Sequence, residues 1–351
     1  ARNLTIDGTT ISDDSDCYVV AEIGHNHQGD LQKCKELFDA AVRCGANAVK
    51  LQKRDNRSLF TRKMYDSSYE SENAYAPTYG AHRECLEFGR EEYRELQNHA
   101  KELGITFFST AFDHKSADFL EDLDMPAYKI ASGDLINTPL IKHVASFGKP
   151  IVLSTGGGTM EDVRRAYETV IPINSQVCIM QCTSSYPLEW EEINLRVIET
   201  FREEFPDIVI GYSGHDSGIA MALISYMLGA RVVEKHFTLN RAWKGTDQAF
   251  SLEPPGLRRM VRDLQRTRVS LGDGIKRCFV SEEAPLHKMG KKLVVSRDLP
   301  EGHVITAADI SIKSPNDGLP PYEFDHLLGK RLRRPLEADE NLSFADIAPP
   351  S

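Results

Sequence analysis

The sequence predicts an α/β fold, a (β/α)8 TIM barrel followed by a small, mostly β domain. The first observation behind this prediction is that eight short apolar runs alternate with eight segments of helical period. The second is that every one of these runs ends in polar residues, as the strands of an enzymatic barrel do. The third is a change of pattern near Gly274, after which short β runs are broken by turn residues.

The apolar runs have the length of buried strands, and the segments between them place apolar residues on one helical face. The runs are 17–24, 48–53, 106–112, 127–132, 151–156, 177–182, 208–215 and 231–238. The expected helices are 30–45, 91–104, 116–123, 140–148, 160–170, 194–205, 218–229 and 256–272. A doubly wound open sheet is the alternative, but no GxGxxG turn follows the first run.

We therefore expect a barrel domain over residues 1–274, a linker over 275–290 and a small domain over 291–351. The small domain contains a near-repeat, DLPEGHVITAADI and PLEADENLSFADI. About 60 residues make a marginal core, so we expect it to dock on a barrel, its own or a partner's. Residues 54–90 are too long for an ordinary connection, which indicates a substrate lid or an interface arm.

Composition excludes several classes of protein. With 41% hydrophobic and 27% charged residues, the 351-residue chain is that of an ordinary globular protein. A net charge of −10 disfavours nonspecific binding to nucleic acid, and an anionic substrate would need its own local cluster of cations. Seven cysteines without a CxxC pair indicate a reduced, cytoplasmic protein. No apolar run is long enough for a membrane span, and no signal peptide is recognised at the start.

The last strand-like run, RVVEKHFTL (231–239), places titratable groups where apolar ones are expected. His236 ends this run and His215 ends the preceding one, and neighbouring strands lie about 4.8 Å apart. Two imidazoles completed by water and substrate oxygens suit Mn²⁺, Fe²⁺ or Zn²⁺ better than Mg²⁺ or Ca²⁺. Glu22 or Glu234 could orient a metal-bound water. The alternative is that each histidine is a hydrogen-bonded wall residue.

Lysines and hydroxyls follow the other strands and form a belt of hydrogen-bond donors suited to an anion. The belt comprises Lys50, Lys53, Lys129, Thr110, Ser132, Ser154, Ser184 and Ser213. Each hydroxyl alone could be a strand-end cap, and Lys129 could instead be a Schiff-base amine. The loop WKGTDQAFSLEP (243–254), which carries Trp243 and Asp247, could bind sugar hydroxyls or form a solvated turn.

Long collinear motifs resemble the sialic acid synthase family, the PEP-dependent N-acylneuraminate synthases. They include AEIGHNHQGD (21–30), YKIASGD (128–134), QCTSSYPL (181–188), FPDIVIGYSGH (205–215) and EKHFTL (234–239). The tail resembles the antifreeze-like (SAF) domain of these enzymes. The resemblance implies a barrel that condenses phosphoenolpyruvate with an N-acyl amino sugar, N-acetylmannosamine for sialic acid itself, and releases phosphate.

The resemblance also implies roles for individual residues. His215 and His236 would hold a divalent metal, Mn²⁺ first, with Mg²⁺ or Co²⁺ as alternatives, and Glu22 and Glu234 would position water or substrate. The lysine and hydroxyl belt would hold phosphoenolpyruvate. Asp134, Tyr186 and Asp247 would face the sugar. The protein would be a homodimer in which each C-terminal domain covers the partner's barrel.

Two positions depart from the bacterial pattern of this family. Ser184 stands where many members have asparagine, and Ser314 stands where many have an arginine that contacts the acyl group of the sugar. Arg331, Arg333, Arg334 or the 54–90 segment could take over that contact. A related sugar of the legionaminic type, a lysine Schiff-base aldolase, and a carbohydrate- or ice-binding tail therefore remain as alternatives.

Overall fold

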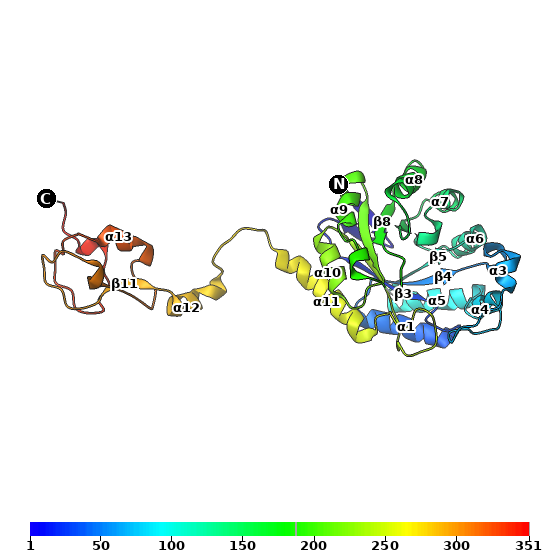
Figure 1. Cartoon of the computed structure of the whole chain (residues 1–351), viewed down its shortest axis with the longest axis horizontal. Helices are drawn as coiled ribbons and strands as arrows, with labels where there is room; N and C mark the ends of the chain where they lie inside the picture. The colour runs from blue at the N-terminus through cyan, green and yellow to red at the C-terminus, as the bar shows by residue number, and fades with distance from the viewer. Residues whose placement is uncertain (187, 351) are drawn as a thin grey trace. The chain divides into compact units, whose positions relative to one another are not determined.

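The computed structural model describes residues 1–186 and 188–350, which divide into two compact units, Ala1–Gly272 and Asp273–Ser351. In the first unit, eight parallel strands close into a barrel in the order β10-β3-β4-β5-β6-β7-β8-β9 (Figure 1). They are β3 (Tyr18–Gly24), β4 (Ala48–Lys53), β5 (Thr106–Ala111), β6 (Tyr128–Ile130), β7 (Ile151–Ser154), β8 (Val177–Cys182), β9 (Val209–Gly214) and β10 (Val232–His236). The predicted barrel is confirmed, and the open sheet is excluded.

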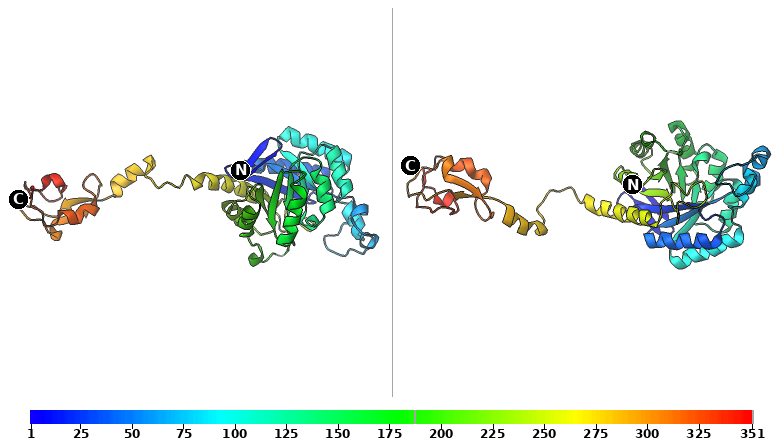
Figure 2. Two further views of the ribbon diagram at one scale, coloured as in Figure 1. Left: turned by 90° about the horizontal axis from the view of Figure 1, so that it is seen from above. Right: turned by 60° about the horizontal axis from the view of Figure 1, so that its bottom comes forward.

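A helix follows each strand and packs outside the barrel (Figure 2). These helices are α1 (Leu31–Cys44), α5 (Arg90–Leu103), α6 (His114–Asp122), α7 (Thr138–Ala145), α8 (Met160–Val170), α9 (Val197–Glu204), α10 (Ala220–Met227) and α11 (Pro254–Leu271). Local sequence explains their limits: in α1, the Asp30 side chain caps the first turn and Gly45 ends the helix in the left-handed region at φ 87°. Among the described residues, no helix is long and apolar enough to cross a membrane.

Inside the barrel, the N-terminal halves of the strands form an apolar layer that includes Val20, Phe108, Cys178 and Val232. A hairpin that precedes the barrel, β1 (Asn3–Ile6) and β2 (Thr9–Ser12), packs Leu4, Ile6 and Ile11 into the same cluster. The hairpin therefore closes the bottom of the barrel. It confines any cavity to the other end, where the strands have their carboxyl termini.

Residues 54–90 hold three short helices, α2 (Asn56–Leu59), α3 (Arg62–Asp66) and α4 (Tyr79–Glu84). The segment is fastened to the loop after β10, because Gly245 N donates to Asn73 Oδ1 (3.1 Å) and Tyr75 Oη donates to Lys244 O (2.7 Å). It therefore forms one rim with the loop that carries Asp247.

The second unit contains helix α12 (Val280–Met289) and an antiparallel pair, β11 (Lys292–Val295) and β12 (Ile310–Lys313), with a short helix α13 (Phe324–Leu327). Helix α12 lies within the expected linker. The near-repeat appears as two matching turns: the Asp309 carboxylate accepts from Thr306 N, and the Asp346 carboxylate accepts from Ser343 N. Each turn is a 3-10 helix, Ala307–Asp309 or Phe344–Asp346. Single 3-10 helices also span Ser132–Asp134, Trp190–Glu192 and Pro321–Glu323.

Candidate active site

A polar layer lies directly above the apolar layer of the barrel. Side chains of a strand alternate between its two faces, so Glu22, Lys50 and His236 continue the inward rows that begin with Val20, Ala48 and Val232. Register aligns these rows, because Glu22 pairs with Lys50 on one side and with His236 on the other. A cavity of about 200 Å³ results, and most of the predicted residues line it: Glu22, Lys50, Thr110, Lys129, Ser132, Ser154, Ser184, Ser213, His215, Glu234 and His236.

Two buried lysines and two buried glutamates form a continuous ionic network at the floor of this cavity. Lys50 Nζ lies 2.8 Å from Glu22 Oε2 and 3.7 Å from Glu234 Oε1, and Lys129 Nζ lies 2.8 Å from Glu234 Oε2. Burial acts to raise the pKa of Glu234, but the two ammonium groups lower it to about 2. Burial acts to lower the pKa of Lys129, but Glu234 raises it above its ordinary value. Glu234 and Lys129 are therefore charged at neutral pH.

Gln52 joins this network, although the sequence analysis did not single it out. Its Nε2 donates to Glu22 Oε1 (2.8 Å). Gly24 makes room for this contact: it has φ +55°, and a Cβ there would lie 3.1 Å from Gln52 Nε2. Gln52 follows Lys50 by two residues, so strand alternation alone could have placed it in the cavity.

The two histidines face each other across the cavity wall, with ring centroids 5.5 Å apart. His215 Nδ1 donates to Thr183 O (2.9 Å), so Nε2 is the nitrogen that could bind a cation, once it has lost its proton. His236 Nδ1 is buried and has no hydrogen-bond partner among the described residues. Burial lowers the pKa of His236. Burial also acts to lower the pKa of His215, but a hydrogen bond with Cys182 raises it to about 9. Cys182 is a second cavity residue that the sequence analysis did not single out.

Close backbone approach brings the hydroxyls of the cavity together. Ser132 Oγ accepts from Gly156 N (2.9 Å), and a Cβ at residue 156 would lie 1.9 Å from Ser184 Oγ. Only glycine leaves room for Ser184 here. Ser154 Oγ is buried and has no hydrogen-bond partner among the described residues, so it can donate to a ligand in the cavity.

Four predicted residues do not line this cavity. Lys53 faces away from it, because it lies an odd number of residues after Lys50, and its Nζ lies 3.2 Å from Glu87 Oε2. Asp247 Oδ2 lies 3.9 Å from His236 Nδ1, at the rim. Tyr186 is 59% exposed and packs on Phe250, which contacts both histidine rings. Asp134 accepts from Asn137 Nδ2 (3.0 Å) next to Ser132.

Comparisons with known proteins agree with this architecture. The NeuB family matches residues 37–276, and the SAF domain matches residues 292–348. N-acetylneuraminate-9-phosphate synthase of Homo sapiens is 40% identical over 327 residues, which are 93% of this chain and 91% of the human one. N,N'-diacetyllegionaminic acid synthase of Legionella pneumophila is 34% identical over 338 residues, 94% of each chain.

Among solved structures, an N-acetylneuraminic acid (sialic acid) synthetase from Leptospira borgpetersenii superposes with a TM-score of 0.71 at 29% identity. The match covers 81% of this chain and 95% of the Leptospira chain. Fold, domain order and sequence thus point to one family. The chain belongs to the NeuB family and carries a C-terminal SAF domain.

Proposed function

We propose that this chain is a sialic acid synthase that condenses phosphoenolpyruvate with an N-acylmannosamine and releases phosphate. The observation that carries the proposal is the cavity in which Lys129, Glu234, His215 and His236 converge beneath a ring of hydroxyls. The names of the human and Leptospira relatives support the same chemistry. A sugar of the legionaminic type is the second candidate, supported by the relative from Legionella.

Phosphoenolpyruvate is anionic, and its binding residues follow from the geometry of the cavity. The two lysines of the floor are already paired with glutamates, so they fix the orientation of an anion more than they supply surplus charge. The hydroxyls of Thr110, Ser132, Ser154, Ser184 and Ser213 surround the same cavity and provide neutral donors. We assign phosphoenolpyruvate to this ring, next to Lys129.

The reaction requires two bonds to form and one to break. C3 of phosphoenolpyruvate uses the electron pair of its double bond to attack the aldehyde carbon of the open-chain sugar, whose oxygen takes up a proton. Water then adds to C2 and loses both of its protons: one balances the proton taken up by the aldehyde oxygen, and the other goes to the departing phosphate. The C2–O bond to phosphate breaks, so that phosphate leaves with the electron pair and a 2-keto acid remains. Glu234 is ionised and therefore cannot donate a proton, so we assign it to holding Lys129 against the anion. Glu22, paired with Lys50, is placed to orient the attacking water.

We further propose that His215 and His236 hold a divalent cation, with Mn²⁺ favoured over Mg²⁺ or Co²⁺. The residues fit such an ion: Thr183 O holds Nδ1 of His215, so a cation would replace the proton on its Nε2, and Nδ1 of His236 is buried with no hydrogen-bond partner among the described residues. Within the described part of the chain, no group of three His, Cys, Asp or Glu side chains could hold a metal, so substrate and water would complete its coordination. When bound, the cation supplies Lewis acidity at the aldehyde oxygen.

The Schiff-base alternative is disfavoured by the state of Lys129. A nucleophilic amine must be neutral, which requires a lowered pKa. Burial does act to lower the pKa of Lys129, but the contact with Glu234 at 2.8 Å raises it above its ordinary value. Lys129 is thus a fixed cation.

A homodimer is proposed on separate grounds. Helix α12 and the residue before it expose Phe279, Val280, Leu286 and Met289, which is more apolar surface than a free helix of ten residues normally leaves to water.

Arg334 is engaged with Asp346 and Glu340, and Arg331 with Gly302 O. Arg333, with no side-chain partner among the described residues, is therefore the best candidate to replace the acyl contact absent at Ser314.

The test is phosphate release from phosphoenolpyruvate with Mn²⁺. N-acetylmannosamine, its 6-phosphate, mannose and a 2,4-diacetamido-trideoxy hexose are compared. Release that needs both an N-acetylmannosamine substrate and a divalent cation is expected. Release with the diacetamido sugar alone would keep the reaction and change the substrate, and no release with any sugar would refute the proposal. Full activity of His236→Ala would refute the assignment of the metal.

A further inference from the structure

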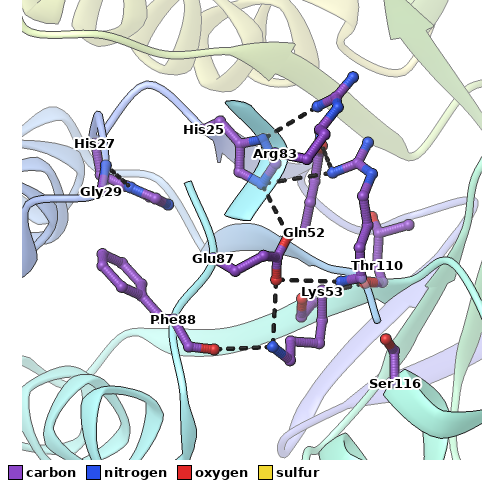
Figure 3. Close-up of polar contacts among 12 residues, drawn as sticks. His25, His27, Gly29, Gln52, Lys53, Arg83, Glu87, Phe88, Thr110 and Ser116 are labelled. Carbon is purple, nitrogen blue, oxygen red and sulfur yellow. Dashed lines mark hydrogen bonds and ion pairs between the residues drawn. The ribbon is translucent and has the colours of Figure 1, made fainter. Parts of the chain in front are cut away.

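A second cluster of cations lies beside the cavity and is not used by the reaction described above. His25 follows β3, Arg54 follows β4, and Arg83 lies in α4. Arg54 Nη1 lies 3.4 Å from His25 Nε2, and Arg83 Nη1 lies 3.4 Å from His25 Nδ1. Two guanidinium groups thus converge on one imidazole, and Figure 3 shows His25 between Arg83 and Glu87.

Carboxylates only partly neutralise this cluster. Glu87 lies 3.2 Å from Lys53 and 3.5 Å from His25. Among the described residues, neither Arg54 nor Arg83 has a carboxylate within 4.0 Å. Burial, together with Arg83, lowers the pKa of Arg54 to about 10, and burial with both arginines lowers that of His25 well below its usual value. His25 is therefore neutral, and Glu87 is the one described carboxylate in contact with this group, beside three permanent cations: Lys53, Arg54 and Arg83.

Many hydrogen-bond donors of the cluster remain free for a ligand. Arg54 is 8% exposed, yet its only acceptor among the described residues, apart from the imidazole, is Gln52 Oε1 (2.8 Å). A guanidinium carries five N–H donors, and buried donors without acceptors are costly. Phe112 stacks under Arg54 with the guanidinium 3.8 Å from the ring centroid, which fixes the plane of the donors. Phe112 also lines the active-site cavity.

The cluster adjoins Asp134 and Asp247, the carboxylates that the family resemblance assigns to the sugar. Gln52 bridges it to the floor, because Gln52 contacts both Arg54 and Glu22. The charge of Arg54 acts on Asp134, and the charge of Asp247 acts on Arg54 and His25, so the arginine lies within electrostatic reach of both carboxylates that would face the sugar. An extended hexose spans about 6 Å from C1 to C6, since three bonds of an extended chain span about 3.5 Å. A substituent on C6 therefore lies well away from the aldehyde.

We propose that His25, Arg54 and Arg83 form a phosphate-binding subsite, and that the amino sugar used by this chain carries a phosphate monoester at the end remote from its aldehyde. This inference rests on the proposed function. A phosphate monoester carries about −1.5 to −2 charges at pH 7, which would balance the positive charge that Glu87 leaves uncompensated in the cluster. Arginine binds phosphate through paired, planar hydrogen bonds, which suits two guanidinium groups that both contact one imidazole ring.

The experiment compares steady-state kinetics with N-acetylmannosamine 6-phosphate and with N-acetylmannosamine in the full chain, for wild type, Arg83→Gln and Arg57→Gln. Arg57 is a matched control, because it is an exposed arginine of the same segment whose guanidinium packs on Tyr65. We expect wild type to prefer the phosphorylated sugar. Arg83→Gln should lower kcat/KM for that sugar roughly tenfold to a hundredfold, because it removes a hydrogen bond between charged groups, and a loss of that size in binding free energy corresponds to this factor. Its KM for phosphoenolpyruvate and its kcat/KM for the unphosphorylated sugar should not change, and Arg57→Gln should match wild type.

If a variant turns over slowly, the inference can still be tested by measuring the binding of mannose 6-phosphate by calorimetry in the absence of phosphoenolpyruvate. Wild type should bind it more tightly than mannose, and Arg54→Lys should weaken that binding. An equal or higher kcat/KM of wild type for the unphosphorylated sugar would overturn the inference and leave the proposed function intact. A rise in KM for phosphoenolpyruvate in Arg83→Gln would assign the cluster to that substrate instead and would also overturn it. No turnover of either sugar would count against the proposed function, whereas phosphate-dependent binding would still support the subsite.

Discussion

Lys235 and Asp216 form a buried ion pair next to the two histidines, and its energetics can be tested directly. Lys235 precedes His236 and Asp216 follows His215, and both side chains are at most 3% exposed. Lys235 Nζ lies 3.2 Å from Asp216 Oδ1 and donates to Asp216 O (2.6 Å), while Tyr212 Oη donates to Asp216 Oδ1 (2.6 Å). Burial lowers the pKa of Lys235, and Asp216 only partly offsets this. The ion pair therefore contributes little net stability, but each partner needs the other.

Lys235→Met should remove the ammonium and leave a buried carboxylate without its cation. Breaking a buried pair in this way costs about 3–5 kcal/mol. A unit of this size loses about 2 °C in Tm per kcal/mol, so the barrel should melt roughly 6–10 °C lower. In the double variant Lys235→Met, Asp216→Asn, no charge is left unpaired and an amide oxygen still accepts from Tyr212. We expect it to recover about 1–3 kcal/mol of that loss.

Thermal unfolding followed by circular dichroism measures all three proteins. Lys149→Met is the control, because Lys149 pairs at the surface with Asp124, whose side chain is 91% exposed, and such pairs contribute about 0–1 kcal/mol. A Lys235→Met barrel that melts within 2 °C of the control variant would refute the reasoning. So would a double variant that melts no higher than Lys235→Met alone.

Three further predictions concern the cavity and the second unit. Glu234→Gln should keep the fold but lower kcat at least about a hundredfold in the phosphate-release assay, because Lys129 loses its partner; unchanged kcat would contradict the assigned role. Removing divalent metal with a chelator should abolish turnover, with recovery on addition of Mn²⁺, whereas persistent turnover would exclude the metal. Burial acts to raise the pKa of Asp309, but hydrogen bonds from His303 and Thr306 lower it below its usual value. The Asp309 carboxylate therefore stabilises the fold fully above the pKa that it has in the unfolded chain, and this stabilisation is lost as the pH falls from there toward its lower pKa in the folded state. Melting of the second unit from pH 7 to pH 3 should show this loss, and Asp309→Asn should flatten the curve; identical curves for the two proteins would count against it.

Strand alternation explains which site residues the sequence could place. Polar residues at strand ends predicted the cavity, and the inward row of β10 runs Val232, Glu234, His236. Proximity to a strand end was not sufficient, however, as Lys53 shows by facing the other way from Lys50. If the alternation of side chains along each strand had been applied strictly, Gln52 would have been predicted to line the cavity in place of Lys53.

Other features had no local signal. His25, Arg54 and Arg83 come from three separate segments, and only closure of the barrel and the folding of residues 54–90 bring them together. The hairpin that closes the barrel was not predicted, although the alternation of Leu4, Ile6 and Ile11 is consistent with it. The division of the chain near Gly272 follows from the end of α11, whereas helix α12 is short and its apolar residues remain exposed.

The distribution of charge links the site and the two proposals about ligands. The floor of the cavity holds two ammonium groups and two carboxylates, so it is close to neutral despite its two lysines. Such a network is rigid and preorganised, but it cannot balance a substrate with several negative charges. Additional positive charge would have to come from elsewhere: from the proposed cation at the histidine pair on one side, and from Arg54 and Arg83 on the other. The chain as a whole carries −10, so in the proposed mechanism these two sources would decide where anions bind. If one anion is phosphoenolpyruvate and the other a sugar phosphate, the aldehyde between them would face the cation, and the two phosphates would be kept apart by the neutral floor.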